Sequence, residues 1–132
     1  MSDVHHVPLC DILGITVNEL LGGGGTYKSG FPSAPSVCER EGTIVSSCVC
    51  VIIPNLTRGV RPYAFVENVV TRADARGHGY ATACLNHAKA LAQQAGCYKM
   101  MLLTGSHDPK TLDFYRHAGY SSTDKTAFIQ WL

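Results

Sequence analysis

Apolar residues recur at helical spacing near the start of the chain. They stand three and four residues apart, at Leu9, Ile12, Leu13, Val17, Leu20 and Leu21. This spacing predicts one amphipathic helix over residues 9–21, although Gly14 interrupts it. Glycines at residues 22–25 end the helix. The stretch that follows carries turn residues, which predict a loop: Gly30, Pro32 and Pro35.

The middle of the chain changes to β-type patterning. Residues 43–53 are rich in β-branched side chains and cysteine and lie between Gly42 and Pro54. A second such run covers residues 61–71. Because only residues 54–60 separate the two runs, we predict an antiparallel hairpin.

The second strand of this hairpin is also the first strand of a predicted strand–helix–strand unit. Residues 82–95 predict a helix with one apolar face, made mostly of small side chains, and Gly96 is a natural C-terminal stop. Residues 98–104 form a short apolar strand. The strands before and after the helix must then be parallel and joined by a right-handed crossover.

The last third of the chain predicts one more helix and one more strand. Asp108 is an N-cap followed by Pro109 at the first helical position, and Gly119 closes the helix. Residues 126–132 (Thr-Ala-Phe-Ile-Gln-Trp-Leu) predict a final strand. The fold class is therefore α/β, with a mixed sheet of the α+β kind.

Composition limits the domain count and the partners. The chain has 132 residues, 45% hydrophobic and 16% charged, which suits one folded domain. A formal net charge of +1 offers no basic field, so we expect neither a nucleic-acid partner nor a membrane partner. No apolar run approaches the ~20 residues that cross a bilayer, and we expect a cytoplasmic protein.

The six cysteines stand inside apolar runs, and we interpret them as reduced core residues. Cys48 and Cys50 have the spacing of one strand face and no histidine nearby, so we expect no metal. His5 and His6 are expected in a frayed terminus. The remaining histidines show no pairing that indicates a metal site.

The connection that opens the helix at residues 82–95 has the chemistry of an anion site. It reads Arg76-Gly77-His78-Gly79-Tyr80-Ala81-Thr82. Glycines leave the backbone bare there, and amide groups at a helix N-terminus, with Arg76 beside them, suit a pyrophosphate. Alternatively, the glycines serve only a tight turn. A Walker loop is excluded because no Lys-Ser/Thr pair follows.

Two motifs in order are similar to a known family. Arg76-x-x-Gly79-x-Ala81 resembles the coenzyme A pyrophosphate signature of the GCN5-related N-acetyltransferases (GNAT family), and Phe114-Tyr115-x-x-x-Gly119-Tyr120 stands where that family has Phe-Tyr-x-x-x-Gly-Phe/Tyr. Residues 96–102, with residues 65–70 upstream, further resemble the glucosamine-6-phosphate N-acetyltransferase branch. The resemblance covers roughly residue 43 to the C-terminus.

The resemblance implies a GNAT-like sheet that opens between its two parallel strands and holds acetyl-CoA there without a metal. Backbone groups around Val69, Val70 and Thr71 would bind the pantetheine and the acetyl carbonyl. The pyrophosphate would lie on amides of the connecting turn: Arg76, Gly77, His78, Gly79, Tyr80, Ala81 and Thr82. Thr111 occupies the position of the branch's asparagine, four residues before the tyrosine, and is included with the cofactor-binding residues. The single domain then divides into an N-terminal helix and loop (residues 1–42) and a CoA-binding core (residues 43–132).

Acetyl transfer to an amine needs a base and an acid. Glu67 is the candidate base, because a desolvated carboxyl on the face of Tyr63 and Phe65 would have a raised pKa. An ion pair of Glu67 with Arg61 or Arg72 is the structural alternative. Tyr115 matches the family's general-acid tyrosine, and its alternative is a core aromatic.

These residues predict an acetyl-CoA-dependent N-acetyltransferase that moves acetyl directly to a primary amine of a small molecule. An amino-sugar phosphate acceptor is the narrower alternative. It is weakened because the branch's Glu-Asp pair is Glu67-Asn68 here and its phosphate-binding basic residues cannot be placed. A non-catalytic acyl-CoA-binding module is the other alternative.

The N-terminal region is short for the family, so a second subunit in a homodimer could complete the acceptor pocket.

Overall fold

The computed structural model describes residues 3–6 and 33–132, with side chains from residue 35 onward. The helix predicted at residues 9–21 and the glycine-rich segment at residues 22–25 lie outside the described residues.

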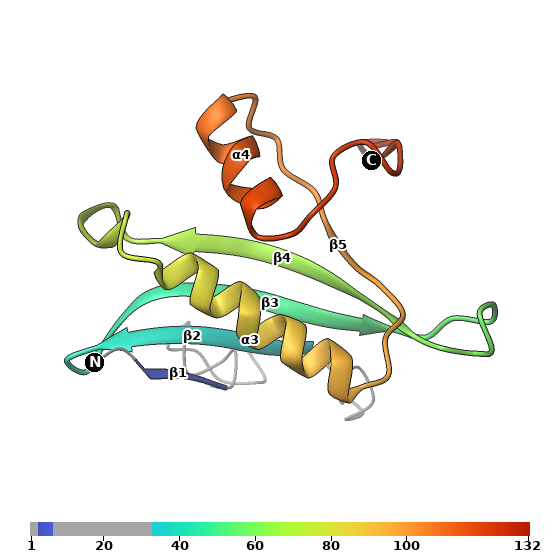
Figure 1. Cartoon of the computed structure of the whole chain (residues 1–132), viewed down its shortest axis with the longest axis horizontal. Coiled ribbons are helices and arrows are strands. Elements are labelled where there is room, and N and C mark those ends of the chain that lie inside the picture. The colour runs from blue at the N-terminus through green and yellow to red at the C-terminus, as the bar shows by residue number, and fades with distance from the viewer. Residues whose placement is uncertain (1–2, 7–32) are drawn as a thin grey trace.

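A five-stranded mixed sheet forms the centre of the described structure (Figure 1). Its strands lie in chain order: β1 (Asp3–His6), β2 (Ser33–Arg40), β3 (Thr43–Ile53), β4 (Tyr63–Thr71) and β5 (Met100–Leu102). The first four strands are antiparallel, and β5 is parallel to β4. The predicted hairpin and the predicted parallel pair are both confirmed.

Two expectations for the N-terminal third are wrong. Residues 33–40, expected as loop, form β2, and the terminus expected to fray contains β1. Glu41 and Gly42 both have positive φ, 52° and 75°, and this two-residue turn joins β2 to β3 as a hairpin. β1 pairs only with residues 36–39, so Pro35 lies past its end, where a missing N–H donor is tolerated.

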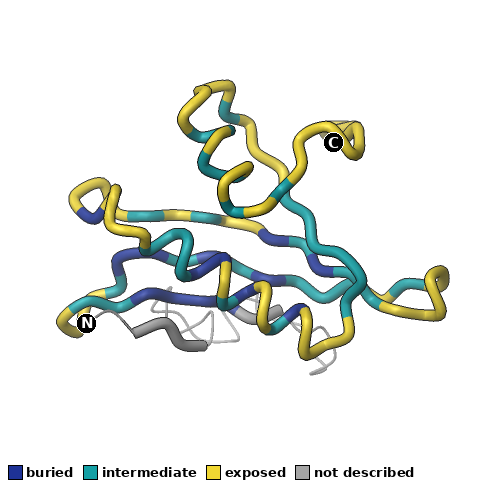
Figure 2. The backbone as a smooth tube through the Cα atoms, in the orientation of Figure 1, coloured by how far each residue is buried: buried dark blue, intermediate teal, exposed yellow. Residues whose placement is uncertain are grey.

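Helix α3 (Tyr80–Gln94) crosses one face of the sheet and covers the core (Figures 1 and 2). Except for Leu85, its buried side chains are small, which lets the helix backbone approach β3: Cys48 Sγ donates to Cys84 O at 3.6 Å and Cys50 Sγ to Ala88 O at 3.8 Å. Gly96, with φ 77°, ends the helix as predicted.

Helix α4 (Pro109–His117) begins as the sequence predicted. The Asp108 side chain accepts a hydrogen bond from the Lys110 N–H at 3.0 Å, and Pro109 is the first helical residue. Figure 1 shows α4 at the side of the sheet opposite β1, to the left of β5.

The final strand predicted at residues 126–132 is not formed. The side chains of this segment have β-propensity, but a strand also needs a hydrogen-bonded neighbour, and none of the described strands pairs with it. Large apolar side chains stay exposed as a result: Phe128, Ile129, Trp131 and Leu132.

A β-bulge at Asn68 reorients the second half of β4. The register passes from Glu67↔Val49 to Val70↔Ser47, so β4 has one residue more than β3 in this interval. Asn68 has a positive φ of 53°. Because the bulge shifts the alternation by one, Val66 and Val69 both face the α3 core, while Glu67 and Val70 are exposed.

Candidate functional site

The parallel strands β4 and β5 separate soon after they meet. Their pairing is confined to Ala64–Val66 of β4 and Met100–Leu102 of β5. β4 then continues through its bulge to Thr71, while the chain after β5 turns away toward α4 (Figure 1). The main chain at Val69–Thr71 therefore has no described strand beside it on the β5 side. This split is the opening that the resemblance implied.

The turn before α3 points free amide groups toward the same end of β4. Gly77 and Gly79 have φ values of 77° and 80°, a conformation that favours glycine. The first bond within the helix runs from Ala83 N–H to Gly79 O at 3.0 Å, so the amides of Tyr80, Ala81 and Thr82 have no helical acceptor. No side chain caps them. Such amides, with the helix dipole behind them, bind anions.

Side chains around the turn fold away from its glycines. Arg76 Nε donates to Thr71 O at 3.4 Å, which ties the turn to the end of β4. His78 Nδ1 donates to Arg76 O at 2.8 Å, and its ring stacks on Tyr80 with centroids 5.7 Å apart. A Cβ added at Gly77 or Gly79 meets nothing within 4 Å, so open space lies over both glycines.

Tyr115 lies on α4 and packs against the same core cluster that Val69 and Tyr80 contact. Burial, together with the nearby Cys48, raises the pKa of its phenol. Its ring meets Phe114 and Tyr120 edge-on, with centroids 5.1 and 6.3 Å away. The phenol therefore keeps its proton at neutral pH, as a general acid must.

Glu67 lies just where β4 loses β5 as a neighbour, but its environment differs from the prediction. The side chain is exposed on the face away from α3, so the expected desolvation is wrong. The arginines considered as ion-pair partners bind elsewhere: Arg61 donates to Gly96 O and Cys97 O, and Arg72 pairs with Asp74 at 2.9 Å. Its role as base stays a prediction.

Thr111 lies half-buried in the first turn of α4, and its part in cofactor binding also stays a prediction. Sequence reasoning missed Asn68, although asparagine is among the residues that tolerate positive φ and could have suggested the bulge. It also missed Tyr120 as a contact of Tyr115; its place directly after the closing Gly119 was the available signal.

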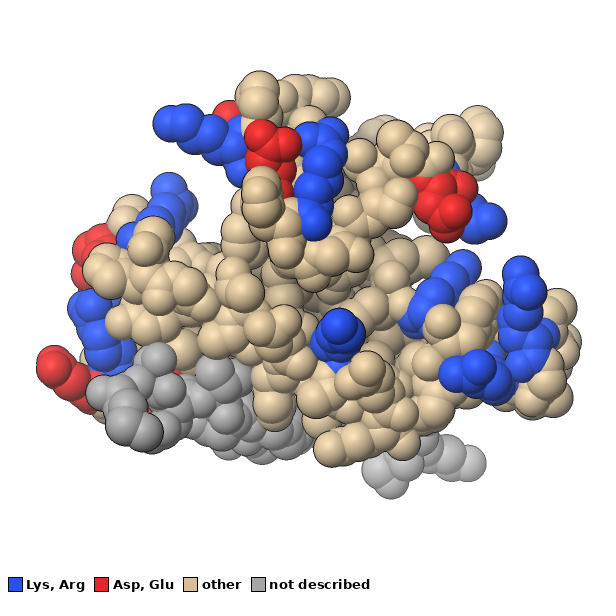
Figure 3. Space-filling view, in the orientation of Figure 1, with Lys and Arg blue, Asp and Glu red and all other residues tan. Residues whose placement is uncertain are grey.

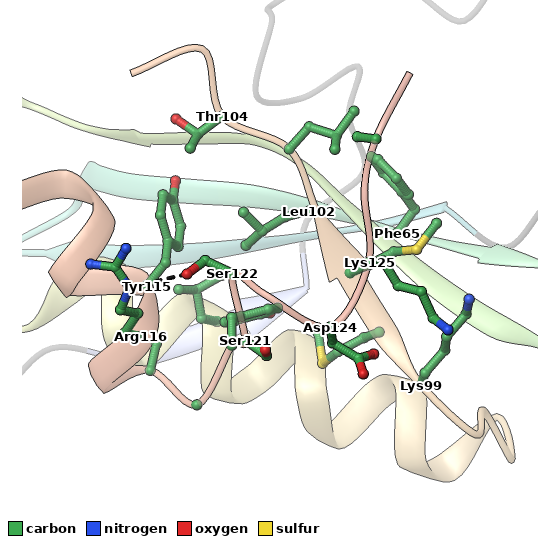
Figure 4. A pocket seen from close by; sticks show the side chains of 18 of the residues that line it. Phe65, Lys99, Leu102, Thr104, Tyr115, Arg116, Ser121, Ser122, Asp124 and Lys125 are labelled. Atoms are coloured by element: carbon green, nitrogen blue, oxygen red, sulfur yellow. Dashed lines mark hydrogen bonds between the residues drawn. The ribbon is translucent and has the colours of Figure 1, made fainter. Parts of the chain in front are cut away.

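A cavity of about 760 Å³ lies around the outer side of β5 (Figure 4). Its walls come from β5, α4, one side of α3 and residues 121–128 of the C-terminal segment. Tyr115, Phe65 and Leu102 line it, but the turn at residues 76–82 does not. The cavity is thus a neighbour of the split, and Tyr115 borders both.

Charged side chains are sparse over the centre of the face in Figure 3, and basic ones gather at the end that carries the β3–β4 connection. Arg58 and Lys99 lie over the Tyr98 ring there. Within residues 3–6 and 33–132 no cluster of three or more His, Cys, Asp or Glu side chains could hold a metal ion. No helix of the described part is long and apolar enough to cross a membrane.

Comparison with known proteins agrees with this geometry. The profile of the family described as "Acetyltransferase (GNAT) family" matches residues 24–120, which is most of the chain. The chain belongs to the GNAT family of acetyltransferases. The predicted resemblance and fold class are confirmed, and the match begins earlier than the predicted residue 43.

Three relatives illustrate the similarity. A glucosamine 6-phosphate N-acetyltransferase of Trypanosoma brucei brucei is 32% identical over 87 residues, 66% of this chain and 57% of that protein. The chain thus spans just over half the length of this curated relative. A putative acetyltransferase from Agrobacterium tumefaciens is 32% identical with a TM-score of 0.78, covering 98% of this chain and 99% of that one. The glucosamine-6-phosphate N-acetyltransferase of Arabidopsis thaliana shares the fold. It is 19% identical with a TM-score of 0.75, covering 100% of this chain and 98% of that one.

Proposed function

We propose that this GNAT protein transfers the acetyl group of acetyl-CoA directly to a primary amine of a small molecule. The observation that carries the proposal is the split between β4 and β5, with the uncapped N-terminus of α3 at one end and Tyr115 on its border. The groups proposed to bind acetyl-CoA and the residue proposed to donate a proton therefore lie together.

The described residues fit a CoA diphosphate. The free amides of Tyr80, Ala81 and Thr82 point at one site, and the open space over Gly77 and Gly79 leaves room for phosphate oxygens close to the backbone. Main-chain groups at Val69–Thr71 would accept the pantetheine as a strand accepts a neighbour. A solved aminoglycoside N-acetyltransferase of the same fold was captured in complex with CoA, at 16% identity and a TM-score of 0.73 over 98% of this chain and 99% of that one.

Bound acetyl-CoA would supply an activated acetyl group as a thioester. Tyr115 donates its phenolic proton to the departing thiolate, because its raised pKa keeps the hydroxyl protonated at working pH. Glu67 takes the proton that the acceptor amine must lose, either directly or through water, and its exposure leaves it accessible to an incoming ammonium. The split holds the two partners in line and lowers the entropic cost of their encounter.

A primary amine on a phosphorylated amino sugar is the narrower candidate acceptor. The Trypanosoma relative, at 32% identity, supports it by its name. Asn68, in place of the branch's second acidic residue, speaks against it, since it forms the bulge and carries no charge. We also propose the cytoplasm as the compartment, because the described cysteines are free thiols.

Thiol release separates an enzyme from a binding module. The protein is incubated with acetyl-CoA and a panel of primary amines, with glucosamine 6-phosphate and glucosamine as a matched pair, and free CoA is measured. We expect amine-dependent release, and a preference within the pair decides whether phosphate is recognised. Isothermal titration with acetyl-CoA runs in parallel: binding without turnover on any amine indicates the non-catalytic module, and absence of binding contradicts the assigned site.

A further inference from the structure

Among the residues that the structure describes, the buried polar side chains are Ser36 and Ser46. Ser36, on β2, is fully buried and bonds to the His87 imidazole of α3 at 2.9 Å. Ser46 is 2% exposed on β3, which lies between β2 and β4 (Figure 1), and its hydroxyl turns to the end of β4. A hydroxyl is stable in an apolar core only when it is hydrogen-bonded, so its partners indicate what it holds in place.

Ser46 contacts two groups at the end of β4. Its Oγ donates to Val70 O at 3.1 Å and lies 2.8 Å from Thr71 Oγ1. Because a serine hydroxyl has one proton and Val70 O accepts it, the Thr71 hydroxyl is the donor in the second bond. Ser46 therefore holds the Val70–Thr71 peptide from the β3 side, just beyond the bulge at Asn68.

The direction of the Thr71 backbone follows from its neighbours. Arg72 N–H donates to Val45 O on β3 at 2.9 Å, so the backbone at Arg72 faces β3. The Val70 carbonyl faces β3 as well, since Ser46 reaches it from there. Main-chain groups of successive residues alternate in direction along an antiparallel strand, so those of Thr71 face the split. A trans peptide likewise directs the Thr71 N–H opposite to the Val70 carbonyl.

The split side of Thr71 offers one free donor. The Thr71 carbonyl accepts from Arg76 Nε at 3.4 Å. Its N–H has no described strand beside it on that side to supply an acceptor. A hydrogen bond to the carbonyl of a peptide polarises the whole group and strengthens its N–H as a donor. The Ser46 hydroxyl therefore both orients the Thr71 N–H and strengthens it.

We propose that Ser46 is a positioning residue for acetyl transfer: its hydrogen bond to Val70 O aims the Thr71 N–H at the carbonyl oxygen of the bound acetyl group. This role rests on the proposed function. In the transfer, the amine nitrogen bonds to the carbonyl carbon, negative charge builds on the oxygen, and the C–S bond then breaks. Glu67 takes the amine proton, and the departing thiolate takes that of Tyr115. A donor already held at the oxygen where charge builds lowers the barrier.

The affinity for acetyl-CoA relative to CoA tests this role without an acceptor amine. The two ligands share the diphosphate and the pantetheine, but CoA lacks the acetyl carbonyl that the Thr71 N–H would bind. Ser46→Ala should weaken acetyl-CoA binding about fivefold and CoA binding little, because one hydrogen bond is loosened. Isothermal titration measures both affinities. Equal weakening of the two ligands, or weakening of neither, overturns the proposal, and so does a wild type that does not bind acetyl-CoA.

Ser36→Ala is the matched control. It removes an equally buried hydroxyl from the adjacent strand β2, where the partner is His87 and not the end of β4. Both variants should melt below wild type, because each leaves a buried partner without its hydrogen bond. Only Ser46→Ala should change the ratio of the two affinities. The same change in Ser36→Ala would assign the effect to lost core stability and would overturn the proposal.

Ser46→Cys keeps the proposal testable if Ser46→Ala does not fold. A thiol has nearly the size of the hydroxyl and is a weaker donor, and the neighbouring core already holds the buried thiols of Cys48 and Cys84. The ratio of the acetyl-CoA and CoA affinities should fall about threefold below wild type. A wild-type ratio in this variant would show that the Ser46 hydroxyl does not act on the acetyl group.

The thioester carbonyl reports the contact directly. Its stretching frequency falls when the oxygen accepts a hydrogen bond, so acetyl-CoA labelled with a carbonyl isotope should absorb at lower frequency when bound to wild type than when free. Ser46→Ala should lose part of this shift, and Ser36→Ala should keep it. Difference infrared spectra of the complexes measure the shift. No shift in wild type, or the full shift in Ser46→Ala, contradicts the proposal.

Turnover distinguishes this role from a failure of the proposed function. With an accepted amine, kcat of Ser46→Ala should fall about tenfold, less than the ~10²-fold cost of deleting an oxyanion donor outright. KM for the amine should not change, and Ser36→Ala should have a kcat close to that of wild type. An unchanged kcat in Ser46→Ala overturns the proposal. If wild type binds acetyl-CoA but acetylates no amine, the proposed function fails, while the titration and infrared results still decide whether Ser46 positions the acetyl carbonyl.

Discussion

Tyr120 caps the helix that carries Tyr115 and at the same time contacts its ring. The Tyr120 N–H donates to Tyr115 O at 3.1 Å, and the two rings meet edge-on at 85° with centroids 6.3 Å apart. Gly119, at φ 97°, makes the reversal that brings the two together. Tyr120, the last residue of the Phe-Tyr motif, thus holds α4 against the core at the border of the split.

Tyr115→Phe should leave the fold and acetyl-CoA affinity intact and lower turnover by about 10²-fold or more, because only the hydroxyl is lost. Since burial raises the pKa of Tyr115, wild-type turnover should not decline through loss of this proton until the pH exceeds 10. Steady-state kinetics from pH 7 to pH 10 measure both effects. Tyr120→Phe, which keeps the ring contact, is the control and should stay within a fewfold of wild type. Unchanged turnover in Tyr115→Phe would show that Tyr115 is a core aromatic residue and not the general acid.

The sequence predicted the parts of the fold that depend on local signals. Asp108 and Pro109 define the start of α4, Gly96 and Gly119 define the two helix ends, and the crossover rule makes β4 and β5 parallel. Each of these depends on a few adjacent residues or on chirality. They were therefore visible without tertiary information.

The errors came from features that depend on pairing. β2 was missed because the Glu41-Gly42 turn is a weaker hairpin signal than Asn-Gly, and Pro35 suggested a loop. Residues 126–132 were assigned to a strand because propensity says nothing about whether a neighbouring strand exists. The turn at residues 76–82 was found from its glycines. The alternation correctly placed Glu67 on the face of Tyr63 and Phe65, but it could not show that this face is left exposed at Glu67.

Gly79→Val should abolish acetyl-CoA binding, because the branched side chain enters the open space over the turn that a phosphate needs. The substitution also strains a backbone at φ 80°, so strain must be matched. Gly96→Val is the control: Gly96 has φ 77°, also faces open space, and lies at the opposite end of α3. Isothermal titration and thermal melting are measured for both. Equal melting with binding lost only in Gly79→Val is expected, and near wild-type affinity in Gly79→Val would disprove the pyrophosphate site.

Arg76→Ala should weaken acetyl-CoA binding more at low salt than at high salt, because an exposed charge acts through a screened field. Arg72→Ala removes a neighbouring positive charge that Asp74 already pairs, at 2.9 Å, and serves as the control. Affinities at about 20 mM and 300 mM salt, on either side of the ~10 Å screening length at 0.1 M, give the comparison. The same loss in both variants would show only a general field effect.

Glu67→Gln should lower turnover most at neutral pH and recover part of it at high pH, where the acceptor amine is already neutral. The side chain is exposed, so the melting temperature should not change. A pH profile of turnover from 6.5 to 10, compared with the nearby isosteric change Asp74→Asn, tests this. A uniform, pH-independent loss would mean that Glu67 binds the acceptor and does not take its proton.

Alkaline pH should unfold the protein through its buried acids. Burial, assisted by Cys84 and Cys50, raises the pKa of Cys48 from 9.0 to about 12, and burial raises that of Cys84 from 9.0 to about 11. The unfolded chain releases these protons first, so their contribution to stability is complete below pH 9 and is lost as the pH rises from 9 toward 12. Each titrating thiol should steepen the decline by about 1.4 kcal/mol per pH unit. Urea unfolding at pH 8, 9.5 and 10.5 measures the slope.

Cys48→Ala should be less stable than wild type at pH 8, because the substitution leaves a cavity. Its free energy of unfolding should also decline less steeply above pH 9. A wild-type free energy of unfolding that stays constant from pH 8 to 10.5 would contradict the buried state of these thiols.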